Sequence, residues 1–236
     1  MRAICPKCNS THIQKKGVVY SKGFECNVQR YKCVGCCKQF QVPRDSPKVD
    51  LPKILLFDIE TAPMEVYVWG LYKQFIPHTN IIKDSEGEEK SWYVLSWAAK
   101  WLYDENVVSD IVTPEETKKR DDKRVLESIW KLLDEADIVI GHNGDRFDLR
   151  KLNARFIDNN IKPPSPFRTI DTLKVARREF AFVSYKQDYL TKHFKLEQKL
   201  STEFQLWVDC IHGNQKRLDE MEEYNRHDVI GLEEVY

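Results

Sequence analysis

The sequence predicts an α/β fold in which helices flank a mixed sheet, preceded by a small cysteine-rich domain. Apolar segments of strand length come first, and strand and helix patterns then alternate towards the C-terminus. Four cysteines lie in two Cys-x-x-Cys pairs within the first 36 residues, ahead of the first strongly apolar segment. A chain of 236 residues is long enough for one mid-sized domain and one small domain.

Composition excludes several classes of protein. Apolar residues make up 42% of the chain and aromatic residues 11%, which is enough for a core. No apolar run approaches the length of a membrane span, and the N-terminus lacks the apolar segment of a signal peptide. Seven cysteines is an odd number, which argues against a secreted disulfide framework. We therefore expect a cytoplasmic protein without a membrane partner.

Charge divides the chain into two parts. Residues 1–50 carry ten Lys and Arg against three Asp and Glu, a balance of +7. The other 186 residues carry 27 against 34, a balance of −7. This asymmetry predicts a module that binds a polyanion, joined to a body that gathers cations.

The two cysteine pairs are separated by 24 residues, an arrangement typical of a zinc ribbon. We expect one Zn²⁺ in a tetrahedral site made by four thiolates: Cys5, Cys8, Cys33 and Cys36. A segment this small has no core of its own, so metal binding would supply its folding energy. Cys37 adjoins Cys36 and is an alternative ligand, while Cys26 and His12 are weaker alternatives.

The segment Gln29-Arg30-Tyr31-Lys32-Cys33, followed by Phe40, resembles the N-terminal zinc domains of insertion-sequence transposases over about forty residues. The resemblance implies contact with nucleic acid. Six basic residues are available to bind phosphates: Lys15, Lys16, Lys22, Arg30, Lys32 and Lys38. Residues 43–52 are polar and proline-rich, which indicates a short linker. We expect a zinc ribbon at 1–46 and a second domain at 47–236.

The second domain is organised around the apolar segment 53–61, bounded by Pro52 and Pro63, which predicts a buried strand. Successive side chains on a strand point to opposite faces, so Asp58 and Glu60 project from the same face. Two neighbouring carboxylates repel each other and are costly to desolvate, and a divalent cation removes that cost. Oxygen ligands suit Mg²⁺ or Mn²⁺.

The other elements follow in order along the chain. Strands are predicted at 66–75, 93–102 and 107–112, with a hairpin turn at 104–106. Thr113 followed by Pro114 starts a helix, and its apolar stripe ends near residue 136. A strand at 138–143, a helix to about 159 and a strand at 168–171 come next. Helices are predicted at 172–180, 184–194, 202–211 and 215–236, and the last looks unfinished, so we expect the natural chain to continue.

Three motifs resemble those of the 3′–5′ exonucleases with the ribonuclease H-like fold. Phe57-Asp58-Ile59-Glu60-Thr61 resembles the first motif. Asn143-x-x-x-Phe147-Asp148 resembles the second, in the form found in proofreading domains of family B DNA polymerases. Tyr224-Asn225-Arg226-His227-Asp228 resembles the third, Tyr-x-x-x-Asp, which marks the tyrosine branch, DEDDy. The resemblance spans roughly residues 53–236 and is closest to small stand-alone exonuclease-like proteins of phages.

The resemblance implies hydrolysis of phosphodiester bonds with two Mg²⁺ or Mn²⁺ ions about 3.5–4 Å apart. It gives Asp58 the bridging position between the ions and assigns the remaining ligation to Glu60, Asp148 and Asp228. Tyr224 and Asp228 are four residues apart on a predicted helix, so they share one face. This spacing lets the phenol orient the attacking water while the carboxylate holds a metal.

Several assignments have alternatives. Asp145 is the main rival of Asp148. Asn143 contacts the terminal nucleotide of the substrate or forms a turn, and the turn is favoured. Asp171 is a helix N-cap or lies close to the site, with the cap favoured, and His227 is expected to be partly exposed on its helix. Phe147 lies near the substrate or in the core, and the core is favoured. Six other aromatic residues could stack on bases, but we expect most of them in the core and one or two at most in contact with the substrate: Trp69, Tyr72, Phe75, Trp92, Trp97 and Trp101.

Our first functional hypothesis is a metal-dependent 3′–5′ exonuclease that acts on single-stranded or frayed 3′ ends, with DNA favoured over RNA. It would serve a replication or recombination protein in trans, in the host cytoplasm if a phage encodes it. The second hypothesis is a zinc-ribbon nucleic-acid-binding protein whose nuclease-like body is inactive. A third is an endonuclease or a processing partner of a recombinase.

Overall fold

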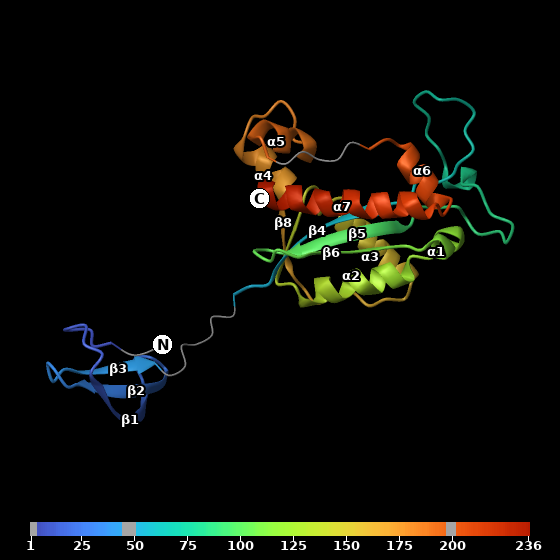
Figure 1. Cartoon of the computed structure of the whole chain (residues 1–236). Coiled ribbons are helices and arrows are strands. Elements are labelled where there is room, and N and C mark those ends of the chain that lie inside the picture. Colours follow the sequence, from blue (N-terminus) through green and yellow to red (C-terminus); the bar gives the residue numbers. More distant parts are fainter. Residues whose placement is uncertain (1–3, 44–50, 197–201) are drawn as a thin grey trace. The chain divides into compact units, whose positions relative to one another are not determined.

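The chain divides into two compact units, Met1–Leu51 and Pro52–Tyr236 (Figure 1). The computed structural model describes residues 4–43, 51–196 and 202–236. The predicted domain boundary after residue 46 therefore lies outside the described residues. Among the helices that the structure describes, none combines the length and the apolar character needed to cross a membrane.

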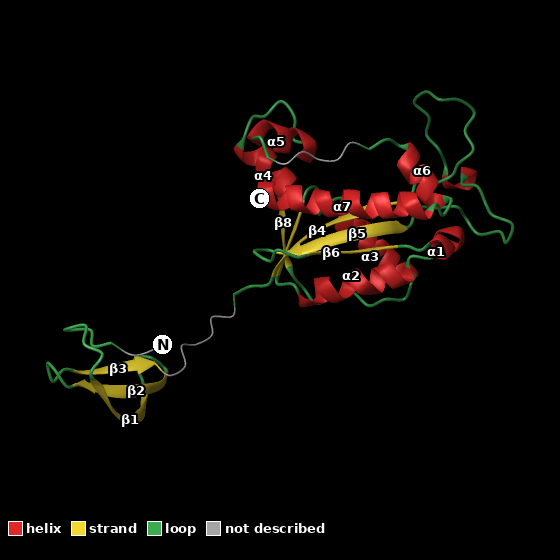
Figure 2. Ribbon diagram, viewed as in Figure 1, coloured by secondary structure: helices red, strands yellow, loops and turns green. Residues whose placement is uncertain are grey.

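The first unit is a three-stranded antiparallel sheet with almost no core. Strands β1 (Ile13–Ser21), β2 (Cys26–Cys33) and β3 (Gln39–Pro43) lie in the order β1-β2-β3 (Figure 2). Of the residues described in this unit, three are buried: Cys5, Val28 and Cys33. So little apolar burial cannot offset the conformational entropy of ordering the segment. The stability of this unit therefore depends on the bonds that join its cysteines.

The second unit contains the mixed sheet that the sequence predicts. Its strands are β4 (Ile54–Thr61), β5 (Val94–Trp101), β6 (Val107–Ile111), β7 (Ile138–Gly141) and β8 (Arg168–Asp171). They lie in the order β6-β5-β4-β7-β8. The central strand β4 runs antiparallel to β5 and parallel to β7. Strand β4 is buried between two neighbours, as its apolar run predicts.

Helices cover both faces of this sheet (Figure 1). On one face, α2 (Lys123–Glu135) and α3 (Asp148–Asp158) pack over the core side chains Leu55, Phe57 and Ile59 of β4. On the other face, α7 (Gln215–Val235) lies along β4, β5 and β6. Leu56 of β4 packs there with Val229 of α7. In the part of this unit that the structure describes there are also four shorter α-helices and one 3-10 helix: α1 (Pro114–Lys119), α4 (Thr172–Glu179), α5 (Gln187–Phe194), α6 (Gln205–Ile211) and η1 (His78–Asn80).

The strand predicted at 66–75 is wrong. This segment, which the structure describes in full, contributes one isolated bridge, between Val66 and Ile81. Trp69, Tyr72 and Phe75 are at least 91% exposed, not part of the core. An apolar, β-branched segment becomes a strand only where a neighbouring strand and a core face receive it, and neither is present here. Trp97 is buried as predicted, while Trp92 and Trp101 are half-buried.

The helix predicted from 113 to 136 is two helices, α1 and α2. Thr113 caps α1 in a capping box with Glu116, as predicted for the helix start. Arg120 then adopts a left-handed backbone, with φ 52°, and ends α1. The break places the buried carboxylate of Asp122 so that it accepts the Val94 N–H at 2.9 Å and pairs with Arg155 at 2.7 Å. The interruption thus ties α2, α3 and β5 together.

We predict that Asp122→Ala destabilises the protein by about 3–5 kcal/mol, because it leaves Arg155 largely buried without its main carboxylate. Urea denaturation of the full chain measures this loss. Asp158→Ala is the matched control, since it removes the exposed partner that the same Arg155 contacts at 3.2 Å. The control should cost about 1 kcal/mol or less. Equal losses from the two variants would contradict the role of Asp122.

Candidate active site

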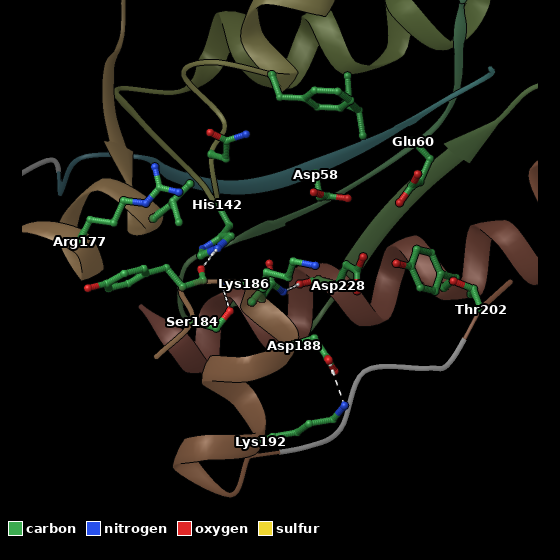
Figure 3. A pocket seen from close by; sticks show the side chains of 17 residues that line it. Asp58, Glu60, His142, Arg177, Ser184, Lys186, Asp188, Lys192, Thr202 and Asp228 are labelled. Carbon is green, nitrogen blue, oxygen red and sulfur yellow. Dashed lines mark hydrogen bonds and ion pairs between the residues drawn. The ribbon is translucent and has the colours of Figure 1, made fainter. Parts of the chain in front are cut away.

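Three carboxylates from the two ends of the second unit's sequence meet at one point. Asp58 and Glu60 lie on β4, and Asp228 lies on α7 (Figure 3). One carboxylate oxygen from each lies within 4.8 Å of the others. Alternation along β4 places Asp58 and Glu60 on the same face as Leu56, which is the face that α7 covers. The structure therefore brings together three of the four acids predicted from the sequence.

A buried amide holds the Asp58 carboxylate from behind. The Asn225 side chain donates from Nδ2 to Oδ2 of Asp58 at 2.8 Å. The Oδ1 atom of Asn225 accepts a hydrogen bond from the Ser96 hydroxyl at 3.1 Å, which fixes the amide's orientation. Asn225 and Ser96 are both completely buried. Because the donor is neutral, it aligns Asp58 without neutralising the charge that would bind a cation.

A second neutral donor reaches Glu60. The indole Nε1 of Trp207, on α6, donates to Oε2 of Glu60 at 3.1 Å. The Trp207 ring also contacts the ring of Tyr224 edge-on, with centroids 5.9 Å apart. Trp207 thus positions a carboxylate and the predicted catalytic phenol together. Neither Trp207 nor the role of Asn225 was predicted, although Asn225 stands inside the third motif.

Asp148 lies beside the three-acid cluster but outside it. It is the first residue of α3, and its carboxylate Oδ1 accepts the backbone N–H of Ile59 at 3.2 Å. This contact places it next to the strand residue between Asp58 and Glu60. Burial raises the pKa of Asp148 to about 7, although the Ile59 N–H opposes the shift. A nearby cation would favour the ionised form.

The rival residue Asp145 has a different environment. Its carboxylate pairs with Lys174 at 2.6 Å. Partial burial would raise the pKa of Asp145, but the Lys174 ammonium holds it below its usual range. The geometry favours Asp148 over Asp145 as the acid of the second motif, because Asp148 alone of the two contacts β4.

The turn after β7 brings two predicted residues to the site. Asn143 adopts a left-handed backbone, with φ 68°, as expected for a turn. The close approach of Gly141 and Gly144 allows the tight turn, since a Cβ on Gly144 would lie 3.2 Å from the Cα of Gly141. Phe147 is 40% exposed and lines the same hollow as Asn143, so the favoured prediction of a place in the core is wrong.

Two further residues, Asp171 and His227, have the structural roles that the sequence favoured for them. Asp171 is the N-cap of α4, because its carboxylate accepts the backbone N–H groups of Leu173 and Lys174. It also accepts the N–H of Asn143 at 2.9 Å, which ties the turn after β7 to α4. His227 is partly exposed and lies 3.2 Å from a carboxylate oxygen of Glu223 on its own helix.

The acids open into a hollow of about 860 Å³, within the usual size range of ligand sites. Asp58, Glu60, Tyr224 and Asp228 line one part of it. Residues of α4, α5 and the segment between them line another part (Figure 3). A cluster of acids at the edge of a hollow of this size can hold divalent cations against an anionic ligand.

The four predicted cysteines of the first unit also converge. The sulfurs of Cys5 and Cys36 lie 3.5 Å apart, and those of Cys8 and Cys33 lie 3.6 Å apart. All four sulfurs lie within 4.8 Å of one another. These distances are close to the edge of about 3.8 Å in a tetrahedron with 2.3 Å metal–sulfur bonds. They exceed by far the disulfide length of about 2.05 Å.

The other candidate ligands lie outside this cysteine group, which does not include Cys26, Cys37 or His12. The backbone N–H of Cys36 lowers the pKa of Cys33 to about 6, which favours the thiolate that metals bind. Of the six basic residues predicted to contact phosphates, Lys32 is half-buried and five are exposed: Lys15, Lys16, Lys22, Arg30 and Lys38.

We predict that Asn225→Leu weakens Mn²⁺ binding by about tenfold or more, since removing an outer hydrogen-bond partner commonly costs this much in metal affinity. Calorimetric titration of the full chain with Mn²⁺ measures the dissociation constant. Asn153→Leu, at an exposed position of α3, makes the same chemical change away from the site. A dissociation constant that is the same in both variants would show that Asn225 does not position Asp58.

Comparison with known protein families agrees with this architecture. A family model described as the RNase H superfamily matches residues 87–236, more than half of the chain. The matched segment includes Asp148, Tyr224 and Asp228, and it begins after β4. No curated protein matches the chain. With its five-stranded mixed sheet and flanking helices, the chain belongs to the RNase H superfamily.

Proposed function

We propose that residues 47–236 form a metal-dependent 3′–5′ exonuclease of the tyrosine branch, DEDDy, similar to stand-alone phage exonucleases. The observation that carries the proposal is the convergence of Asp58, Glu60 and Asp228 within 4.8 Å at the edge of the hollow. Membership of the RNase H superfamily supports a nuclease-type activity. The substrate would be a single-stranded or frayed 3′ end, with DNA favoured.

The donor set fits two Mg²⁺ or Mn²⁺ ions, because all the converging groups are carboxylates. Asp58, Glu60 and Asp228 would hold the ions, and Asp148, which lies beside them, would complete the ligand set. When bound, the ions would supply Lewis-acid stabilisation of the phosphoryl oxygens and activate water. Asn225 and Trp207 orient Asp58 and Glu60 for this ligation.

Tyr224 would orient the attacking water. It lies one helical turn before Asp228 on α7, so its phenol and the Asp228 carboxylate share a face. The ring is 6% exposed and is held edge-on by Trp207, which limits its freedom to turn away. Asn143 lines the same hollow and is available to contact the terminal nucleotide.

We propose that residues 1–46 are a zinc ribbon that binds nucleic acid. The sulfur separations of 3.5 and 3.6 Å fit one Zn²⁺ held by Cys5, Cys8, Cys33 and Cys36. The ion would supply the stability that the three residues found buried among those described in this unit cannot. The exposed lysines and Arg30 would contact phosphates and release counterions.

One observation favours a second function, a nucleic-acid-binding protein with an inactive body. Asp148 hydrogen-bonds to the β4 backbone and stands outside the three-acid group. If Asp148 serves only to fix β4, the site lacks the fourth acid that a second ion would use. The two functions differ in whether Asp148 is needed for hydrolysis.

We predict that Asp58→Ala, Asp148→Ala and Asp228→Ala each abolish metal-dependent release of nucleotides from unblocked 3′ ends. Tyr224→Phe should slow release without abolishing it, because the water is oriented less well. Asp145→Ala is the matched control and should remain active. Labelled DNA and RNA oligonucleotides with free or blocked 3′ ends, incubated with Mg²⁺ or Mn²⁺, measure the activity. An inactive Asp145→Ala beside an active Asp148→Ala would reverse the assignment of the second motif.

We predict one tightly bound Zn²⁺ per chain, lost on Cys5→Ser or Cys33→Ser. Cys37→Ser is the control, because Cys37 adjoins the site but lies outside the cysteine group. Elemental analysis of protein purified with zinc present gives the metal content. A wild-type protein without zinc, or zinc loss in Cys37→Ser alone, would overturn the ligand set.

A further inference from the structure

Three cations of the described chain line the hollow that holds the acids: Arg177, Lys186 and Lys192, of which Lys192 pairs with Asp188. Arg177 lies on α4, and Lys186 immediately precedes α5 (Figure 3). Both residues are exposed. Within the part of the chain that the structure describes, no carboxylate pairs with either side chain. The Arg177 guanidinium instead lies 5.9 Å from the ring centre of Tyr185.

Neighbouring cations on the same helices are already paired. Lys174 pairs with Asp145, Arg178 pairs with Glu179, and Lys192 pairs with Asp188. Arg177 and Lys186 therefore differ from their neighbours in facing the hollow without a counter-charge. The second unit as a whole has an excess of acids, so two such cations beside an acidic cluster call for an anionic ligand.

The wall that carries these cations is fixed to the acid site. The ring of His142 contacts the Tyr185 carbonyl oxygen and the Thr172 hydroxyl, each at 2.8 Å. The Tyr185 hydroxyl donates to the Phe180 carbonyl oxygen at 2.9 Å. The Gln187 side chain donates to the backbone carbonyl of Asp228 at 2.7 Å. The residue that follows Lys186 is thus tied, through its side chain, to the backbone of α7 at Asp228.

We propose that Arg177 and Lys186 bind the phosphodiester next to the scissile one, on its 5′ side. This inference rests on the proposed function. A 3′-terminal nucleotide brings only the scissile phosphate to the metals, so a second phosphate in the hollow must lie on its 5′ side. A guanidinium matches two phosphate oxygens with its planar fork, and an ammonium adds a point charge.

The charge balance of the sequence predicts that the first unit supplies the affinity for phosphates and that the acidic second unit repels the phosphate backbone of the substrate. The proposed phosphate site gives the second unit a share of this affinity. Arg177 and Lys186 give the second unit its own phosphate contacts at the place where the nucleic-acid strand must enter. The substrate class that follows is a strand of at least three nucleotides, not an isolated nucleotide ester or a dinucleotide.

The test compares the double variant Arg177→Gln/Lys186→Gln with the control Arg178→Gln/Lys216→Gln. Both remove two positive charges, and the control residues are exposed and do not line the hollow. The probe is a fluorescent DNA single strand of about eight nucleotides, in a buffer that contains zinc but no Mg²⁺ or Mn²⁺, so that hydrolysis plays no part and the first unit keeps its metal. Fluorescence anisotropy gives the affinity at several salt concentrations. Circular dichroism confirms that both variants fold.

We expect the double variant to bind at least tenfold more weakly than the control. Its salt dependence should be shallower by about 1.4 in the slope of log affinity against log salt, which is about 0.7 for each lost contact. Affinities and slopes that match those of the control would overturn the phosphate site. The contribution of the first unit is common to both variants and cancels in the comparison.

A second measurement separates this proposal from the exonuclease itself. With Mg²⁺ present, the KM of the double variant should rise above that of the control for an octanucleotide, and far less for a dinucleotide, which has no second phosphodiester. If the wild-type protein releases no nucleotides but the double variant still binds more weakly, the phosphate site stands and the exonuclease proposal fails. If the wild type is active and the two double variants have equal KM values, the phosphate site fails.

Discussion

The repulsion among Asp58, Glu60 and Asp228 is the constraint that the second unit has to satisfy. Three carboxylates within 4.8 Å oppose folding unless a cation and aligned donors offset their charge. Strand β4 is central in the sheet and α7 packs across it, which brings the three acids together. The neutral donors Asn225 and Trp207 then align the carboxylates of Asp58 and Glu60. Cationic donors in the same places would have stabilised the cluster and weakened its affinity for metal.

The two units solve the problem of stability in opposite ways. The second unit buries a large apolar core on both faces of its sheet and can tolerate a costly acidic cluster. The first unit buries three of its described residues, two of them cysteines, so its fold and its sulfur cluster are the same feature. In the second unit a stable fold supports the acidic site. In the first unit the cysteine site supports the fold.

Features set by local periodicity were predictable from the sequence. Alternation along β4 places Asp58 with Glu60, and the four-residue spacing on α7 places Tyr224 with Asp228. Features set by distant contacts were not: the hydrogen bond of Trp207 to Glu60 joins residues 147 positions apart. The strand predicted at 66–75 failed for the related reason that an apolar pattern does not reveal whether a partner strand is available. The break before Asp122 likewise follows from its contacts with Val94 and Arg155, which no local pattern shows.

The order of the acids along the chain affects how the site comes into being. Asp58 and Glu60 belong to the first strand of the second unit, whereas Asp228 belongs to its last helix. A ribosome therefore releases the strand acids long before the helix that completes the cluster. Until α7 docks, a nascent or truncated chain holds two acids without the third, and its cation affinity stays low. Metal binding then becomes a signal that α7 has docked on β4, and any chemistry at the cluster starts only after that step.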